Sequence, residues 1–207
     1  MPTGKLQCSQ TSSSDSNAHD ALRSTRNPEE PIFLAALLIS SSLGISAFAM
    51  GRPKPQLPLE TVGHVDLRRY TGVWYEIARL PQKFEKGCVG VTATYEINSD
   101  GNLDVLNSCR VDSLGGRLKT ARGTAKVVDA QSNAKLKVTF FWPFYGDYWI
   151  LELGPNFEYS VVGSPDRAYF WILSRTPSLP NTIVNGILTR FSAKAFDLSG
   201  IYRTPQE

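Results

Sequence analysis

Gly72-Val73-Trp74-Tyr75-Glu76 is the stretch of sequence that decides the fold, because it opens a predicted strand over residues 73–79. Far along the chain, Trp171-Ile172-Leu173-Ser174-Arg175 ends another predicted strand. We predict that the two strands lie side by side at the closed end of a small barrel. There the Arg175 guanidinium covers the Trp74 ring, a cation–π contact that contributes about 0.5–2 kcal/mol. Gly72, Trp74 and Arg175 are therefore assigned to stability and not to chemistry.

Eight segments of the chain have the pattern of strands, with apolar and polar residues alternating or apolar residues predominating. Asn98-Ser99-Asp100-Gly101-Asn102 joins two of them and contains Asp-Gly, a strong hairpin signal. Gly123 marks a predicted bulge or bend of the kind that barrels need. Consecutive strands without crossover helices predict an antiparallel up-and-down sheet, and eight such strands remove their edges by closing. The predicted strands are residues 73–79, 91–97, 103–107, 118–128, 135–140, 148–151, 157–161 and 169–175.

One α-helix is predicted after the strands. Ile183, Ile187, Leu188 and Phe191 fit a 3.6-residue repeat, and Ser178 is the predicted N-cap. The strands just before it are apolar on both faces, which predicts that one face lines the interior and the other is covered by the helix. The predicted fold is therefore all-β: an eight-stranded antiparallel up-and-down β-barrel with one C-terminal α-helix packed outside.

The N-terminal part differs in composition from the rest of the chain. Residues 1–30 are rich in Ser, Asn, Thr and Asp, which indicates disorder. Residues 31–49 form an uncharged apolar run ending in Ala47-Phe48-Ala49, which predicts a signal peptide, with an uncleaved membrane anchor as the alternative. Residues 50–63 are a predicted linker rich in proline, and residues 64–207 form the barrel domain. The apolar run predicts an exported protein.

Charge and histidine content exclude several classes of function. The net charge of +3 is too small to favour nucleic acid as a partner. Only His19 and His64 are present, which argues against histidine-rich metal sites and most histidine-dependent catalysis. We therefore expect no metal, no cofactor and no catalytic residue.

Several of these segments, taken together, resemble the lipocalin family. Gly72-x-Trp74, Phe84-Glu85 in the first loop, and Trp171-Ile172-Leu173-Ser174-Arg175-Thr176-Pro177 before the helix carry the resemblance, which covers residues 64–203. Val91-Thr92-Ala93-Thr94-Tyr95 and Phe141-Trp142-Pro143-Phe144-Tyr145-Gly146 are similar to the bacterial branch of the family, which also resembles apolipoprotein D.

The resemblance implies a barrel open at one end that binds hydrophobic molecules. In the bacterial branch it implies fatty acids and lysophospholipids as ligands, and a role in lipid storage or transport. The implied location is the periplasm or the cell envelope; outer-membrane association stays open, since no lipid-attachment cysteine directly follows the apolar run. The expected partner is a hydrophobic small molecule, and association with the membrane and a homodimer are left open.

Five residues are predicted to line the interior and contact the ligand. Alternation places Tyr95, Phe140 and Trp171 on the apolar faces of their strands, and the resemblance adds Tyr148. Glu76 is a candidate to point inward and meet a ligand head group. The alternative is that such side chains fill a packed barrel without a cavity.

Other charged residues are further candidates for contact with a head group. Glu152 is a second acidic candidate for the interior. Lys83, Lys86 and Arg110 lie in or near loops, where they would attract a carboxylate or phosphate at the mouth. Their alternative role is that of ordinary surface charges.

Cys88 and Cys109 are the only cysteines after the apolar run, and an even pair in an exported domain predicts a disulfide. The alternative is an enzyme acting on a lipid, because some lipocalin relatives are thiol-dependent isomerases. A free Cys88 or Cys109 would then be the nucleophile, assisted by Tyr95 or Glu76. A structural or partner-binding envelope protein is a third hypothesis.

Overall fold

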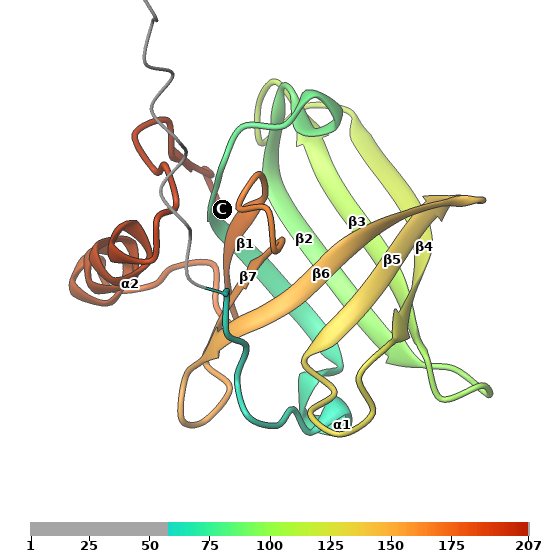
Figure 1. Ribbon diagram of the computed structural model, residues 1–207. Coiled ribbons are helices and arrows are strands. Elements are labelled where there is room, and N and C mark those ends of the chain that lie inside the picture. Colours follow the sequence, from blue (N-terminus) through green and yellow to red (C-terminus); the bar gives the residue numbers. More distant parts are fainter. Residues whose placement is uncertain (1–57, 207) are drawn as a thin grey trace, which may run out of the picture. The chain divides into compact units, whose positions relative to one another are not determined.

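A computed structural model describes residues 58–206 of the chain (Figure 1). The predicted disordered extension, the predicted signal peptide or anchor, and most of the predicted linker lie outside these residues. The described end of the linker already packs on the barrel: Leu59 is buried, and the Val62 amide donates to the Ile150 carbonyl at 3.1 Å. The folded part therefore begins before His64.

Eight antiparallel strands form a closed barrel, as predicted. They follow one another around the wall from β2 to β8, and β1 closes the ring by pairing with both β8 and β2. A short ninth strand adds to β1 on the outside of this series. The strands are β1 (Gly72–Arg79), β2 (Cys88–Ile97), β3 (Leu103–Val111), β4 (Leu118–Val127), β5 (Lys135–Phe141), β6 (Phe144–Leu153), β7 (Tyr159–Gly163), β8 (Phe170–Ser174) and β9 (Tyr202–Arg203).

The β5–β6 hairpin is longer than predicted. We expected residues 141–147 to connect the strands, but β5 continues to Phe141, β6 begins at Phe144, and Gly146 pairs with Val138. Pro143 lies at the turn, where its missing N–H costs no ladder hydrogen bond. The ladder therefore runs almost to the hairpin tip.

Gly123 of β4 lies where the pairing of β4 with β5 ends, while the pairing of β4 with β3 continues. The β3–β4 ladder continues across it without a shift, so the predicted bulge is absent there. A Cβ at this position would lie 2.8 Å from the Phe140 ring and would also clash with the Thr139 carbonyl. Glycine thus allows β5 to cross closely over β4, and the pairing of the two strands begins only at Thr124.

The closed end is built around Trp74. The helix α1 (Leu67–Tyr70) precedes β1, and the buried Trp74 indole donates to the Tyr70 carbonyl at 2.8 Å. The Arg175 guanidinium carbon lies 3.8 Å from the Trp74 ring centroid, so the structure has the predicted contact. Arg175 also donates to the carbonyls of Val73 at 3.0 Å and Arg69 at 2.5 Å. It therefore joins the end of β8 to β1 and α1.

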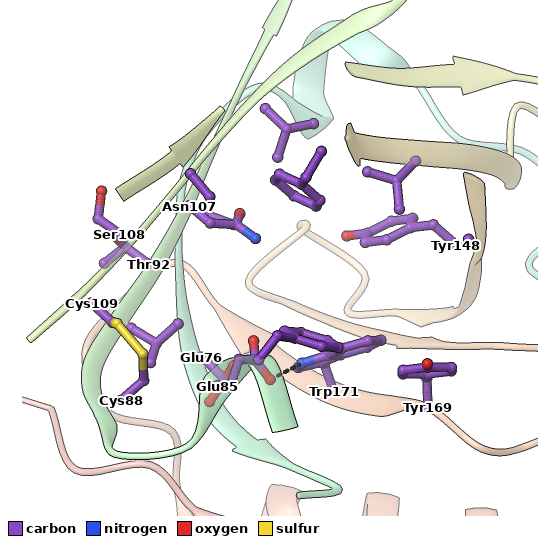
Figure 2. Close-up of a pocket in the computed structure, with 18 of the residues that line it drawn as sticks. Glu76, Glu85, Cys88, Thr92, Asn107, Ser108, Cys109, Tyr148, Tyr169 and Trp171 are labelled. Carbon is purple, nitrogen blue, oxygen red and sulfur yellow. Dashed lines mark hydrogen bonds between the residues drawn. A yellow bond between two sulfur atoms is a disulfide. The ribbon is translucent and has the colours of Figure 1, made fainter. Parts of the chain in front are cut away.

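A disulfide joins Cys88 of β2 to Cys109 of β3, as predicted (Figure 2). Cys88 pairs in register with Val111, and the β2–β3 ladder shifts between Val89 and Thr92. The shift brings the two sulfur atoms into bonding distance although simple hairpin counting does not place the residues opposite each other.

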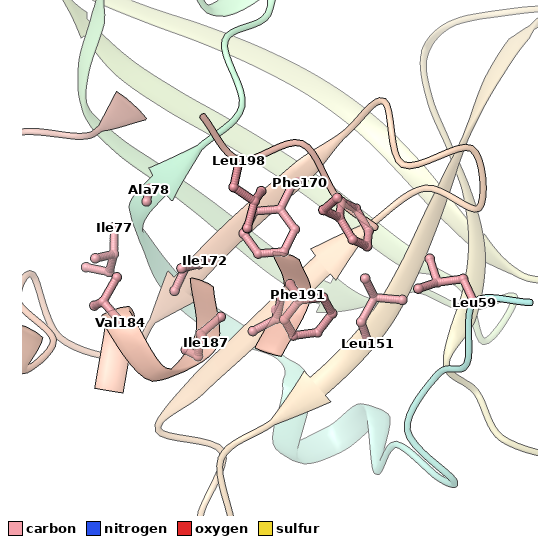
Figure 3. Close-up of a cluster of buried hydrophobic side chains, with 12 residues drawn as sticks. Leu59, Ile77, Ala78, Leu151, Phe170, Ile172, Val184, Ile187, Phe191 and Leu198 are labelled. Atoms are coloured by element: carbon pink, nitrogen blue, oxygen red, sulfur yellow. The ribbon is translucent and has the colours of Figure 1, made fainter. Parts of the chain in front are cut away.

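The helix α2 (Asn181–Ala193) lies outside the barrel, as predicted. Its Val184, Ile187 and Phe191 are fully buried in a cluster with β1, β6 and β8 residues, drawn in Figure 3. The N-cap is Pro180 and not Ser178, because a residue before proline is disfavoured in the helical region and Leu179 therefore stays outside the helix.

The segment after α2 completes the wall between β1 and β2. These two strands pair directly only over Gly72–Tyr75. Beyond that point β9 pairs with β1, and the Gly90 amide of β2 donates to the Pro205 carbonyl at 2.8 Å. The segment therefore fills a seam where the two strands separate.

Candidate functional site

The barrel encloses a cavity of about 740 Å³ (Figure 2). This volume lies within the range of roughly 300–1,000 Å³ that is usual for small-molecule pockets. Its wall is mostly apolar, because the inward faces of β2, β3, β5, β6 and β8 carry aliphatic and aromatic side chains. These include Val91, Ala93, Val105, Val138, Phe140, Phe144, Trp171 and Leu173.

All five residues predicted to face the interior line this cavity: Glu76, Tyr95, Phe140, Tyr148 and Trp171. The barrel therefore contains a cavity, and the alternative prediction of an interior filled by side chains was wrong. Contact of these five residues with a ligand stays a prediction.

A series of four hydroxyl groups runs from the cavity wall, which Tyr95 and Tyr148 line, to the buried side chains of Tyr70 and Ser160. The Tyr95 and Tyr148 hydroxyls are 2.9 Å apart, Tyr148 and Tyr70 are also 2.9 Å apart, and Tyr70 lies 3.1 Å from the Ser160 hydroxyl. Burial raises the pKa of Tyr70 to about 12, and burial also raises the pKa of Tyr148 well above its ordinary value. The phenols thus stay neutral and can both donate and accept hydrogen bonds.

Arg79 lies between the buried carboxylate of Glu76 and the partly buried carboxylate of Glu85 at the wall of the cavity. Its guanidinium pairs with Glu76 and lies 3.4 Å from the Glu85 carboxylate, and it donates to the Thr204 hydroxyl at 3.0 Å. The Trp171 indole donates to the same Glu85 carboxylate at 3.3 Å. Thr204 also contacts Glu76, so the segment after α2 is tied into this network.

The single guanidinium of Arg79 thus faces the carboxyl groups of both Glu76 and Glu85. If both carboxyl groups were ionised, one negative charge would be left without a counter-ion away from water. Burial raises the pKa of Glu76, opposed by the positive charge of Arg79. Burial, together with the negative charge of Glu76, raises the pKa of Glu85 to about 7. The carboxyl group of Glu85 therefore titrates near neutral pH at the cavity wall.

A β-bulge explains why the sequence pattern did not find Arg79. The β1–β8 register shifts between Glu76 and Ala78, so strict alternation fails there. Ala78 joins the cluster under α2, and Arg79 reaches the carboxylate pair, with its guanidinium carbon 4.7 Å from the Tyr202 ring centroid. No signal in the sequence announces the shift.

The charges at the cavity mouth differ from those predicted. Lys83, Lys86 and Arg110 do not line the cavity, whereas Lys119 of β4 does. Lys119 donates to the Phe84 carbonyl at 3.0 Å and is the one cation among the described lining residues. The carboxylates of Glu76, Glu85, Asp147 and Asp166 all line the same space.

Glu152 points away from the cavity. Its carboxylate lies 2.5 Å from the Arg190 guanidinium of α2 and accepts a hydrogen bond from the Tyr159 hydroxyl at 2.9 Å. The second acidic candidate for the interior was therefore wrong: Glu152 anchors the helix to the outside of the barrel.

Asn107 of β3 turns its amide toward the cavity, across from Tyr148 (Figure 2). Its side-chain oxygen is buried and has no hydrogen-bond partner among the described residues. A buried acceptor without a donor costs about 1–3 kcal/mol, so the oxygen favours a ligand that supplies one. Asn107 was missed because a single polar residue on a strand gives no signal of its own.

Within residues 58–206, no group of three or more potential metal ligands lies close enough to hold an ion. The same residues contain no helix with the length and apolar character needed to cross a membrane.

A closed antiparallel barrel with one outer helix and an apolar interior defines a class of small-molecule binding proteins. The chain belongs to the lipocalin family: residues 65–206 match the family model described as a lipocalin-like domain.

Three named relatives show the breadth of the match. Outer membrane lipoprotein Blc of Escherichia coli K12 is 37% identical over 166 residues, which cover 80% of this chain and 93% of that protein. Temperature-induced lipocalin-1 of Arabidopsis thaliana is 36% identical, covering 72% and 83%. Apolipoprotein D of mouse is 32% identical, covering 84% and 94%.

Solved structures share the fold at lower identity. Insecticyanin from the tobacco hornworm Manduca sexta superimposes with a TM-score of 0.60 and 22% identity, over 75% of this chain and 88% of that one. At this identity the likeness supports the barrel fold alone.

Proposed function

We propose that this lipocalin binds single-chain lipids, such as lysophospholipids and fatty acids, and stores or transports them in the bacterial cell envelope. The cavity of about 740 Å³ with its apolar wall is the observation that carries the proposal. The relative from Escherichia coli K12 is named an outer membrane lipoprotein, which supports an envelope location.

Burial of the acyl chain supplies the affinity. Each methylene removed from water contributes about 0.8 kcal/mol, so burial of a chain of about 16 carbons contributes roughly 12 kcal/mol to the binding free energy, before the entropy lost on binding is subtracted. Ordering the lipid and losing its free motion removes several kcal/mol, which leaves a Kd of about micromolar. Selectivity for the length of the chain is expected to be loose.

The charges of the wall favour a zwitterionic head group over a bare carboxylate. Lys119 is available to a phosphate, while Asp166, and Glu85 in its ionised form, repel a ligand carboxylate and attract an ammonium group. We therefore expect lysophosphatidylethanolamine and lysophosphatidylcholine to bind more tightly than palmitate at neutral pH.

The disulfide counts against the thiol-dependent enzyme. The sulfur atoms of Cys88 and Cys109 are bonded to each other, so neither is free to attack a substrate in this state. Tyr95 and Glu76 are already engaged with Tyr148 and Arg79.

Displacement of a fluorescent fatty-acid probe from delipidated protein tests the proposal. We expect lysophosphatidylethanolamine to displace the probe at micromolar concentration. Val138→Trp fills the cavity and should abolish displacement, whereas Val128→Trp, at a site 56% exposed, is the matched control and should not. Binding that is absent in the wild type, or equal in both variants, would refute a cavity-bound lipid.

A further inference from the structure

Large aromatic side chains are exposed together at the tip of the β5–β6 hairpin. Phe141, Trp142 and Phe144 are 75%, 77% and 71% exposed, and the Phe141 and Phe144 rings stack with centroids 6.4 Å apart. Leu118, at the start of the neighbouring strand β4, is 52% exposed. Exposed rings gathered at one hairpin tip, as Phe141, Trp142 and Phe144 are, mark a surface that another apolar phase covers.

The tip of the β5–β6 hairpin does not pair with β4. Pairing between β4 and β5 covers only Thr124–Val127 with Leu136–Thr139, so residues 118–123 of β4 pair with β3 alone. Figure 1 shows the hairpin extending beyond this part of the wall. Lys119 and Ala121 on one side, and Phe141 and Phe144 on the other, line the cavity. Because the two Phe side chains are also exposed, the cavity reaches the surface between β4 and the tip.

The flank of the opening is basic. β4 contains Lys119, Arg122 and Lys126 and no acidic residue. The exposed Asp104 of β3 pairs with Thr124 and lies on the same outer face as Arg122 and Lys126, so this face keeps one net positive charge from these three residues. Arg122 and Lys126 are exposed, and the Lys126 amine lies 5.7 Å from the ring centroid of Tyr145 at the base of the tip. On the tip side, Asp147 is paired with Lys137 at 2.9 Å and so does not cancel this charge.

A lipid bilayer fits this combination better than a protein partner does. Trp and Phe side chains are favoured at the boundary between head groups and acyl chains, and neighbouring cations are attracted to anionic lipids. A hairpin tip with three exposed rings is too small for a stable protein interface, which buries about 1,200 Å² or more.

We infer that the β5–β6 tip docks this protein on an anionic bilayer surface, and that a lipid tail enters the cavity sideways between β4 and the tip. The docking stands independently of cargo, whereas the side entry rests on the proposed function. Trp142 itself does not line the cavity, so docking and ligand binding can be tested apart.

Quenching of Trp142 by brominated lipids tests the docking. The exported protein is mixed with vesicles of equal parts phosphatidylglycerol and brominated phosphatidylcholine, and the signal of a Trp142→Phe variant is subtracted to remove the other tryptophans. We expect strong quenching of Trp142 and a blue shift of its emission. Arg122→Gln and Lys126→Gln should each weaken vesicle binding roughly fivefold. Val128→Gln, at an exposed site away from the tip, is the control.

Uptake of a fluorescent lysophospholipid tests the side entry. Trp142→Ser should slow uptake from vesicles about tenfold and leave the Kd for the same lipid in solution unchanged. Intact binding in solution without quenching of Trp142 would overturn the docking. Quenching with unchanged uptake in Trp142→Ser would overturn the side entry alone, and absence of binding in solution would overturn the proposed function while the docking stands.

Discussion

Arg175→Ala tests how the closed end is held together. The side chain covers the Trp74 ring at 3.8 Å and donates to the carbonyls of Val73 and Arg69. Its loss leaves the Trp74 face uncovered and removes the link between β8 and α1. Because Arg175 does not line the cavity, the variant should affect stability and not binding.

The expected loss of stability follows from these contacts. A partly exposed cation–π contact contributes about 0.5–1 kcal/mol, and a charged hydrogen bond to a carbonyl about 1 kcal/mol after screening by solvent. The ring contact and the two hydrogen bonds add up to about 2.5–3 kcal/mol. For a domain of this size, each kcal/mol lowers the Tm by about 2–4 °C, which predicts a decrease of roughly 5–12 °C.

Thermal unfolding followed by near-ultraviolet circular dichroism, together with urea titration, measures the change. Lys194→Ala is the matched control, because the Lys194 amine lies 4.9 Å from the Phe191 ring centroid at the exposed end of α2. It should lower the Tm by no more than about 2 °C. An unchanged Tm in Arg175→Ala, or a lipid affinity that falls with the Tm, would contradict the assignment of Arg175 to the closed end.

Three other predictions concern the cavity wall. Replacing Cys88 and Cys109 with Ser should lower the free energy of unfolding by about 3 kcal/mol, since the bond joins residues 21 apart in sequence; two free thiols in the exported wild-type protein would contradict the disulfide. The raised pKa of Glu85, about 7, means that the folded state holds a proton that the unfolded state releases, so stability should fall as the pH rises from about 4.5 to about 7. Glu85→Gln should flatten this part of the urea-unfolding profile, and a wild-type stability that rises there would refute the burial of the carboxyl. Asn107→Leu should tighten binding of a plain acyl chain about fivefold or more and should not do so for a hydroxylated chain, as measured by probe displacement; equal gains for both would show that the Asn107 oxygen does not recognise a ligand hydroxyl.

The barrel and most of its lining follow from patterns that a sequence displays directly. Alternation has a period of two, so it places Tyr95, Phe140 and Trp171 on the inward faces without knowledge of the neighbours of each strand. The helix period and the doubly apolar strands before it likewise place α2 outside. Local rules are sufficient wherever a strand is regular.

The remaining features depend on contacts between distant segments. The bulge before Ala78 places Arg79 against Glu76, and the segment at Thr204 completes the same network. Lys119 reaches the mouth because β4 is not covered by the hairpin tip there. A β-bulge and a gap between two strands change neither the composition nor the spacing of residues. The positions of Arg79 and Lys119 therefore could not be predicted from the sequence.

The linear series of hydroxyls from Tyr95 to Ser160 can be ordered in two opposite senses, because each O–H is able to point either way along it. If the protons point toward Ser160, Tyr95 presents its lone pairs to the interior. If they point the other way, Tyr95 presents a proton. Reversing the four O–H bonds thus changes Tyr95 from a hydrogen-bond acceptor to a donor without moving a heavy atom, so the same wall can meet either kind of polar group on a ligand.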